Sequence, residues 1–343
     1  MFEMACMKGS EMFAEAIPGV IIQMMAIVTK EKGQDVLLGA WISLAISAFS
    51  TGFISASISY DFDTNPEKRH SSPQFYGYIP ARSSKRTTIF VTLIFFSAGM
   101  LLIRCTCIVL LGLVGKQWVF AYIGADLALY LMVKIMRGDF WYWIPAGPQA
   151  ELLLSCWIRT LIKIVVDFTS IIQFRHPSEL GGLYWIISFV LTMGSLPVVI
   201  WIYEGQGGDK IVVTLAWKLL YILLPSTLVL FGIFVANIEM KYWNTFVSLE
   251  TGKNFRIREF KEGTTDAVKA EIFKRSHRVW HPIEGEVRAW VCANWSRWDE
   301  EEPAWLNEYM RSRIPLEWIP SEDRYRESMR RSSVGRPPSL GQA

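Results

Sequence analysis

The stretch that decides the fold is residues 88–115, TIFVTLIFFSAGMLLIRCTCIVLLGLVG, which carries one charged residue, Arg104, among 28. A run of about 18 or more mostly apolar residues is long enough to cross the hydrocarbon core of a bilayer as a helix. The stretch is therefore a predicted membrane span. Its arginine raises the question of which groups surround a charge at that depth.

Similar apolar segments fill the chain as far as about residue 238, and 51% of its 343 residues are hydrophobic. These segments predict an all-α fold, a polytopic transmembrane helical bundle (residues 1–238) of six or seven membrane segments. The expected location, a plasma membrane or endomembrane of a eukaryote, does not follow from them. A helical cytosolic region is predicted for 239–320 and a disordered tail for 321–343. The predicted membrane segments are 12–29, 36–60, 88–115, 118–136, 151–173, 181–203 and 211–237.

The charges of the connections predict the orientation. Loops rich in Lys and Arg usually stay in the cytosol, which favours a cytosolic side for loop 61–87 and for the C-terminal region. An even number of crossings must then separate the two, whereas five candidate segments follow residue 87. The basic residues of the loop are Lys68, Arg69, Arg82, Lys85 and Arg86.

Segment 151–173 is the candidate that departs most from an ordinary span. Arg159, Lys163 and Asp167 follow each other at intervals of four residues and so share one helix face. The segment is expected to lie at the interface, to re-enter, or to cross while it faces a polar interior. The preferred prediction is six crossings with cytosolic termini. The alternative is seven, with the two basic regions on opposite sides.

Small residues recur every four positions in the second segment, which favours close packing between helix backbones in lipid. A polar track for lipid headgroups is the alternative interpretation. These residues are Gly39, Ser43, Ser47, Thr51, Ser55 and Ser59.

Ionisable groups within the segments have two interpretations. Each costs at least about 2.5–3.5 kcal/mol at membrane depth, so such groups usually pair with each other or line a hydrophilic route. Lys163 and Asp167 can pair at i, i+4. Cross-helix ion pairs and a polar path remain open for the set, which comprises Glu15, Arg104, Asp126, Arg159, Lys163 and Asp167.

The C-terminal region has helical periodicity and many tryptophans, which predicts a small packed helical module. Binding of a protein partner is the alternative role. From Ser321 onward the chain is polar, basic and rich in Pro, Gly and Ser, which predicts disorder. The tryptophans are Trp280, Trp290, Trp295, Trp298, Trp305 and Trp318.

No sequence motif indicates an enzyme, a metal or a cofactor. The sequence DFDTN at 61–65 begins like a calcium loop, but Pro66 stands where that loop needs glycine and Ser72 where it needs glutamate. The four histidines lie outside the spans. The predicted partners are the lipid bilayer, phospholipids and a protein at the C-terminal region, with no nucleic acid among them.

The sequence EAIPGVIIQ, residues 15–23, places a glutamate, a proline and a glutamine in the first span. It resembles a hallmark of the XK-related family of membrane proteins, and the following helix, AWISLAISAFSTGFISASISYDFD, resembles that family's next segment. The resemblance covers about residues 11–62, and Gly19 stands where the family has glutamine. The C-terminal region resembles multi-pass proteins of diatoms and related algae, which implies no function.

The family resemblance implies passive exchange of phospholipids between leaflets, with headgroups moving along polar residues. It implies that Glu15, Pro18 and Gln23 form a polar helix break that faces the lipid route, and some relatives partner with lipid-transfer proteins. The charged face of 151–173 is a candidate second wall. A membrane scaffold and a small-solute or ion transporter are the alternatives.

Three structural features separate these hypotheses. A scramblase requires a groove that is open to lipid along its side. A transporter requires a closed central cavity at mid-membrane. A scaffold requires that its buried charges be paired off.

Overall fold

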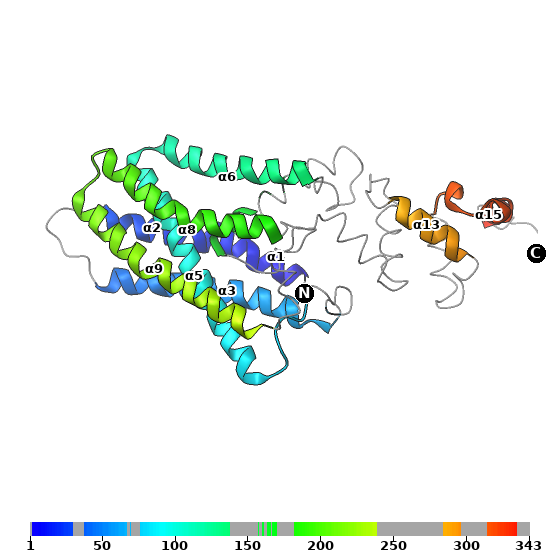
Figure 1. Cartoon of the computed structure of the whole chain (residues 1–343), viewed down its shortest axis with the longest axis horizontal. Helices are drawn as coiled ribbons and strands as arrows, with labels where there is room; N and C mark the ends of the chain where they lie inside the picture. Colours follow the sequence, from blue (N-terminus) through cyan, green and yellow to red (C-terminus); the bar gives the residue numbers. More distant parts are fainter. Residues whose placement is uncertain are drawn as a thin grey trace, which may run out of the picture. The chain divides into compact units, whose positions relative to one another are not determined.

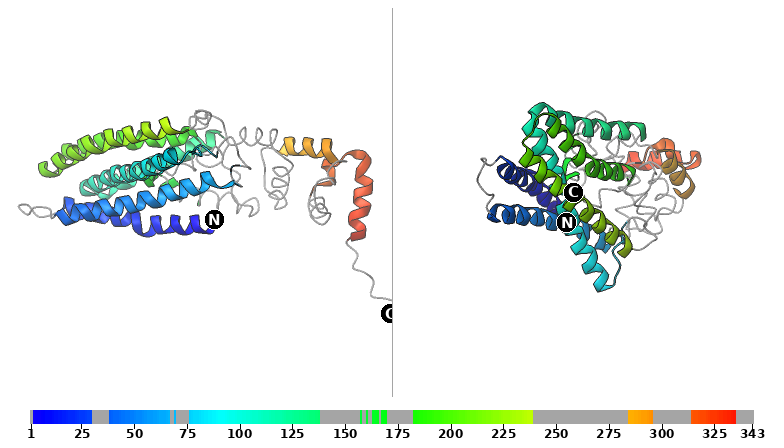
Figure 2. Two further views of the ribbon diagram at one scale, coloured as in Figure 1. Left: turned by 90° about the horizontal axis from the view of Figure 1, so that it is seen from below. Right: turned by 60° about the vertical axis from the view of Figure 1, so that its left-hand side comes forward.

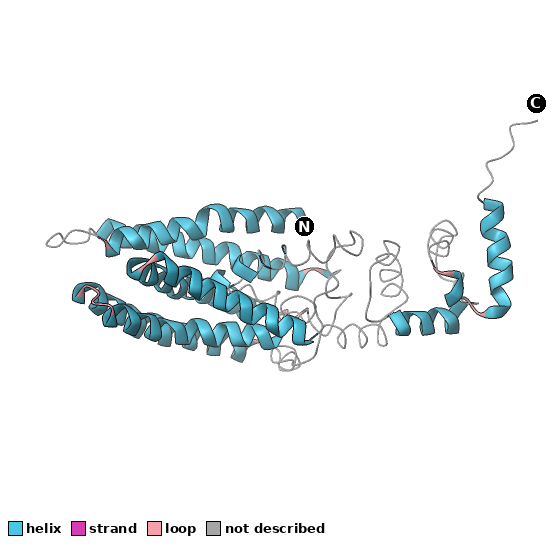
Figure 3. Ribbon diagram, turned by 90° about the horizontal axis from the view of Figure 1, so that it is seen from above, coloured by secondary structure: helices cyan, strands magenta, loops and turns pink. Residues whose placement is uncertain are grey.

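The computed structural model describes residues 2–29, 38–66, 69, 76–137, 157, 160, 163–165, 167–169, 182–238, 284–295 and 314–334. Every element among them is helical, as Figure 3 shows, which confirms the predicted all-α class. The elements are α1 (Phe2–Glu11), η1 (Met12–Ala16), α2 (Ile17–Val28), α3 (Leu38–Thr64), α5 (Ser83–Val114), α6 (Lys116–Arg137), α8 (Gly182–Gly205), α9 (Lys210–Asn237), α13 (Glu284–Asn294), η5 (Leu316–Trp318) and α15 (Ser321–Val334).

The chain is a multi-pass membrane protein. The described residues contain six helices that are long and apolar enough to cross a membrane: Met7–Val28, Leu38–Thr64, Ser83–Val114, Lys116–Met136, Leu183–Gly205 and Lys210–Asn237. They overlap six of the seven predicted segments. Apolar helices satisfy their backbone groups internally, which is what a lipid environment requires.

Helix α5, which contains the stretch quoted first, is the central helix of the bundle. In its most apolar window 78% of residues are buried, against 17–44% in the other five spans. A helix that is apolar on all sides belongs in the interior. Helices α2, α3, α6, α8 and α9 all pack against it, as Figures 1 and 2 show.

Glycines bring α5 close to two of its neighbours. A Cβ atom at Gly52 of α3 would meet the backbone carbonyl oxygen of Ile94, and one at Gly99 of α5 would lie 2.5 Å from Thr227 Oγ1 of α9. Small residues permit such approaches, which give the dispersion contacts that hold membrane helices together.

Segment 151–173 is described only at Trp157, Thr160, 163–165 and 167–169, all of them helical. Lys163, Asp167 and Thr169 are buried, and the carbonyl oxygen of Thr169 accepts a hydrogen bond from Ser55 Oγ at 2.9 Å. The described residues from Lys163 to Thr169 therefore lie inside the bundle, whereas Trp157 is exposed. Re-entry and crossing stay open as predictions, because the rest of the segment lies outside the described residues.

The C-terminal part of the chain forms a separate unit, whose described elements are α13, η5 and α15. Trp295 and Trp318 are buried, and Cys292 Sγ donates to the carbonyl oxygen of Trp318 at 3.0 Å. Thus the two described tryptophans pack within the unit. The other four tryptophan side chains and the helix predicted after Pro303 lie outside the described residues.

The predicted disordered tail needs a correction over its first part, because Ser321–Val334 forms helix α15. Two acidic residues, Glu322 and Asp323, lie in its first turn, where they favour the positive end of the helix dipole. Glu327 pairs with Arg330 at 3.2 Å and i, i+3 spacing. The prediction of disorder used composition only, and composition does not record the order of the charges along the helix.

Candidate functional site

Four ionisable side chains meet inside the bundle, and we call them the buried quartet: Arg104, Asp126, Lys163 and Asp167. Arg104 Nη2 lies 2.6 Å from Asp126 Oδ2 and 3.4 Å from Asp167 Oδ2. Lys163 Nζ lies 2.5 Å from Asp126 Oδ2 and also pairs with Asp167 Oδ2. None of the four side chains is more than 9% exposed.

The quartet lies well inside the membrane-spanning part of the bundle. Arg104 is ten residues before the end of α5, and Asp126 is ten residues after the start of α6. At 1.5 Å per residue both lie about 15 Å from the turn that joins these helices. Groups at this depth need partners, and the quartet has two positive and two negative charges.

Three hydroxyl groups of α8 add hydrogen bonds to the quartet. Ser188 Oγ donates to Asp167 Oδ1 at 2.7 Å, and Tyr184 Oη donates to Asp126 Oδ1 at 3.2 Å. Thr192 Oγ1 lies 3.5 Å from Arg104 Nη1. Both oxygens of each carboxylate therefore have a partner, as a buried carboxylate requires.

Aromatic rings flank the two cations. The Arg104 guanidinium lies 5.2 Å from the ring centre of Tyr122 and 5.7 Å from that of Phe168. Lys163 Nζ lies 5.8 Å and 5.6 Å from the rings of Tyr130 and Tyr184. Ring faces attract cations, so the quartet is a neutral, enclosed cluster that ties segment 151–173 to α5, α6 and α8.

The other predicted polar residues lie apart from the quartet. Glu15 is exposed on the outside of the bundle. Gln23 is partly buried, and its Nε2 donates to Ser47 Oγ of α3 at 3.0 Å. Arg159 lies outside the described residues. The seven predicted path residues thus form no single cluster in the described part of the chain.

The chain stays helical through Pro18, with a wider π-helical turn directly before it, at Met12–Ala16. Proline has no N–H to donate and its ring crowds the carbonyl group four residues earlier, which is Ala14 here. A π turn accommodates this by shifting the hydrogen-bond ladder. Glu15 lies within this turn.

The row of small residues on α3 is buried over its second half only. Gly39 and Ser43 are exposed and Ser47 is partly buried, whereas the later members are buried. Ser55 Oγ lies 3.1 Å from Ser97 Oγ of α5. The second half of the row, comprising Thr51, Ser55 and Ser59, therefore lies at a helix contact.

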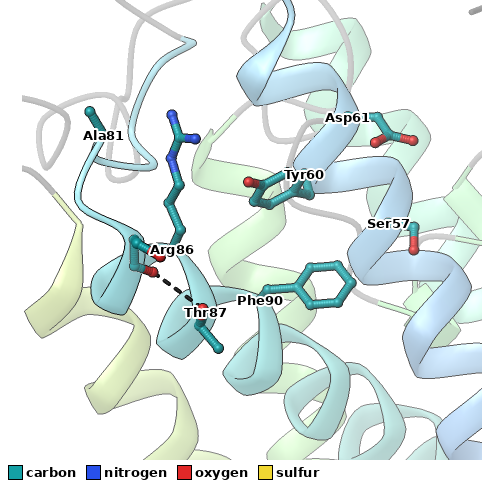
Figure 4. A pocket seen from close by; sticks show the side chains of 8 residues that line it. Ser57, Tyr60, Asp61, Ala81, Arg86, Thr87 and Phe90 are labelled. Atoms are coloured by element: carbon teal, nitrogen blue, oxygen red, sulfur yellow. Dashed lines mark hydrogen bonds between the residues drawn. The ribbon is translucent and has the colours of Figure 1, made fainter.

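An open groove of about 490 Å³ lies between the last turns of α3 and the first turns of α5 (Figure 4). Ligand pockets usually have volumes of about 300–1,000 Å³. Six of its eight lining residues are polar, and Arg86 and Asp61 are the charged ones. We call this the α3/α5 groove, and it is lined by Ser57, Tyr60, Asp61, Ala81, Ser83, Arg86, Thr87 and Phe90.

A carboxylate beside the groove holds the connection between α3 and α5. Asp63 Oδ1 accepts hydrogen bonds from the backbone N–H groups of Gly77 and Tyr78, at 2.6 and 3.1 Å. Asp63 Oδ2 accepts from the N–H of Ile79 at 3.0 Å and pairs with Arg69 at 3.4 Å. This is the second aspartate of DFDTN, and its role is to anchor the loop.

Neither the groove nor the Asp63 anchor is predictable from the sequence, because both depend on residues 77–87 folding back against the end of α3. Gly77, at a positive φ of 94°, marks the turn that permits this. A glycine next to two tyrosines was the available signal, and it is a weak one.

No family model, curated protein or solved structure matches this chain. The resemblance of residues 11–62 to the XK-related family therefore stays a prediction.

Proposed function

We propose that this membrane protein is a passive phospholipid scramblase whose lipid headgroups enter at the α3/α5 groove. The observation that carries the proposal is the groove itself, which is open and has six polar side chains among its eight lining residues. A charged or zwitterionic headgroup needs such a lining if it is to leave the water at the membrane surface.

Exposed hydroxyl groups continue from the groove along α3. Ser43, Ser50 and Ser57 are spaced seven residues apart, so they share one face, and the first two are exposed. They extend over about 21 Å of helix, a large part of the roughly 30 Å hydrocarbon core. A lipid whose tails stay in the bilayer has hydroxyl partners along this face.

The position of the groove also suits a headgroup. Helix α5 has 32 residues and is therefore about 48 Å long, which exceeds the hydrocarbon thickness of about 30 Å. Its first turns, which carry Ser83, Arg86 and Thr87, are followed by the apolar run from residue 88. They thus belong to the headgroup layer. The resemblance to the XK-related family supports the same function.

Reconstitution tests the proposal. The purified chain is placed in liposomes that contain a fluorescent phospholipid in both leaflets, and a membrane-impermeant reductant is added outside. Scrambling without ATP makes nearly all of the fluorescence accessible, whereas empty liposomes lose only the outer half. Quenching that stays at the one-leaflet limit refutes the proposal.

Arg86→Gln tests the groove in the same assay. We expect the initial scrambling rate to fall about tenfold, because a hydrogen bond to a charged group contributes about 1.5 kcal/mol or more. Arg82→Gln is the matched control, since Arg82 is exposed and does not line the groove. Equal scrambling rates for the two variants would show that lipid headgroups do not pass through the groove.

The six described spans and the basic loop 61–87 support an orientation with both termini and this loop in the cytosol. Two spans precede the loop and four described spans follow it. If segment 151–173 re-enters without crossing, the C-terminal unit lies on the same side as the loop.

A membrane scaffold is the second candidate function, and the closure of the buried quartet favours it. Its charges are paired and surrounded by rings, so they offer no polar route through the described interior. A scaffold would give no scrambling in liposomes and would bind a partner through its C-terminal unit, which cross-linking in its native membrane would detect.

A further inference from the structure

The α3/α5 groove carries one positive and one negative residue, so its lining is neutral overall. In Figure 4, Arg86 lies at one end, Asp61 and Ser57 lie at the other, and the rings of Tyr60 and Phe90 lie between them. Asp61 also has a cation from outside the groove lining, because Lys8 Nζ lies 3.6 Å from its Oδ2. A lining with opposite charges at its two ends suits a ligand that itself has two opposite charges.

Two aromatic rings form a corner in the middle of the groove. The ring centres of Tyr60 and Phe90 are 5.5 Å apart, and the ring planes meet at 77°. Rings arranged as walls around a site are how proteins recognise ammonium groups, because each ring face attracts a cation. A carboxylate close to such a corner strengthens this attraction.

Both charged residues have atoms available for a ligand. Arg86 Nε donates to the carbonyl oxygen of Pro80 at 3.1 Å, which fixes the side chain and leaves both Nη groups without a described partner. Asp61 Oδ2 lies 3.6 Å from Lys8 Nζ, and both side chains are substantially exposed, at 47% and 29%. Such surface pairs contribute little to stability and open readily.

We infer that the α3/α5 groove binds a zwitterionic phospholipid headgroup, in which a phosphodiester is joined to an ammonium group. Arg86 and the hydroxyls of Ser83 and Thr87 hold the phosphate, since a guanidinium is well suited to phosphate oxygens. The ammonium group lies against Tyr60 and Phe90 and near Asp61. This inference rests on the proposed lipid-handling function and names its substrate class.

A direct binding experiment tests the inference apart from transport. The full chain is reconstituted in vesicles that contain a photoactivatable lipid with either a phosphocholine or a phosphoglycerol headgroup. Cross-links to peptides from the α3/α5 groove are then counted by mass spectrometry. We expect about threefold or more labelling by the phosphocholine lipid, the discrimination that a cation–π contact of about 0.7 kcal/mol gives. Equal labelling, or a preference for phosphoglycerol, overturns the inference.

Substitutions test which groove residues hold the ammonium group and which hold the phosphate. Asp61→Asn and Tyr60→Leu should abolish the preference for phosphocholine, whereas Tyr60→Phe should keep it because the ring remains. Arg86→Gln should lower labelling by both lipids, and Arg82→Gln should leave it unchanged. A preference that survives both Asp61→Asn and Tyr60→Leu contradicts the placement of the ammonium group.

Competition on the unaltered protein does not depend on how any variant folds. Soluble phosphocholine should reduce labelling by the phosphocholine lipid more than inorganic phosphate does. If inorganic phosphate competes equally well, the groove is a site for phosphate alone and the inference fails. Selective labelling in vesicles that show no scrambling would retain the headgroup site and reject the transport function.

Discussion

Individual charges in this bundle are stabilised by their neighbours and not by water. Arg104 and Lys163 face two carboxylates, and the hydroxyl of Ser188 and the rings of Tyr122 and Tyr130 surround them. Desolvation of each ion costs several kcal/mol, and removal of one cation leaves the two carboxylates to share the other. The stability of the quartet therefore depends on its equal numbers of positive and negative side chains.

We predict that the single substitution Lys163→Met lowers the free energy of unfolding by about 3–5 kcal/mol, the usual cost of breaking a buried pair. Lys163→Met combined with Asp167→Asn should lose less than the single variant, because it restores neutrality. Denaturant titration of the detergent-solubilised protein measures both. Lys116→Met is the control, since Lys116 is exposed. If the double variant instead lost as much free energy of unfolding as the two single variants together, charge neutrality would not be what stabilises the quartet.

Between elements, the closest described approach joins α3 and α5, and it also positions the groove. Gly52 lies against the backbone of Ile94, one helical turn after Phe90 on α5. Phe53 and Phe90 pack edge to face nearby, with ring centres 5.7 Å apart. The spacing of these two helices therefore sets the shape of the groove above them.

We predict that Gly52→Ala destabilises the bundle by about 1–3 kcal/mol, the usual cost of overpacking a tight contact. The added methyl group would meet the carbonyl oxygen of Ile94, and a backbone atom cannot move aside as a side chain can. Gly39→Ala on the same helix is the control, because nothing lies within 4 Å of a Cβ atom there. Thermal unfolding in detergent should separate the two variants, and equal midpoints would refute the close contact.

For the whole molecule, the open question is which side of the membrane each connection occupies. Asn294-Trp295-Ser296 is an acceptor sequence for N-glycosylation, which occurs on the lumenal side. It therefore reports the side of the C-terminal unit independently of lipid transport.

We predict that Asn294 receives no glycan when the chain is synthesised in the presence of microsomes, because the C-terminal unit stays in the cytosol. Gel mobility with and without a glycosidase measures this. A fusion that directs residues 239–343 into the lumen through a signal peptide should be glycosylated, which shows that the acceptor is usable. A glycan on the full chain would instead support seven crossings.

Several features followed from the sequence through single residues or short windows. The apolar run around Arg104 predicted a helix in the membrane, and the polar face of Lys163 and Asp167 predicted an unusual segment. At Pro18 the sequence predicted a helix break, whereas the chain stays helical there and has a π turn at Met12–Ala16. The partners of Arg104 did not follow, since Asp126, Asp167 and the exposed Glu15 were equally suitable carboxylates.

Apolar runs of this length in lipid must satisfy their backbone hydrogen bonds internally, so the amino-acid sequence was enough to predict a chain that crosses a membrane several times as helices. The folded bundle was needed to show that Arg104, Asp126, Lys163 and Asp167 form one neutral cluster while Glu15 lies outside it. It also decided that Asp61 and Arg86, 25 positions apart, line the same groove. Both outcomes depend on how helices rotate and approach each other, which is set by packing among all of them and not by any one segment.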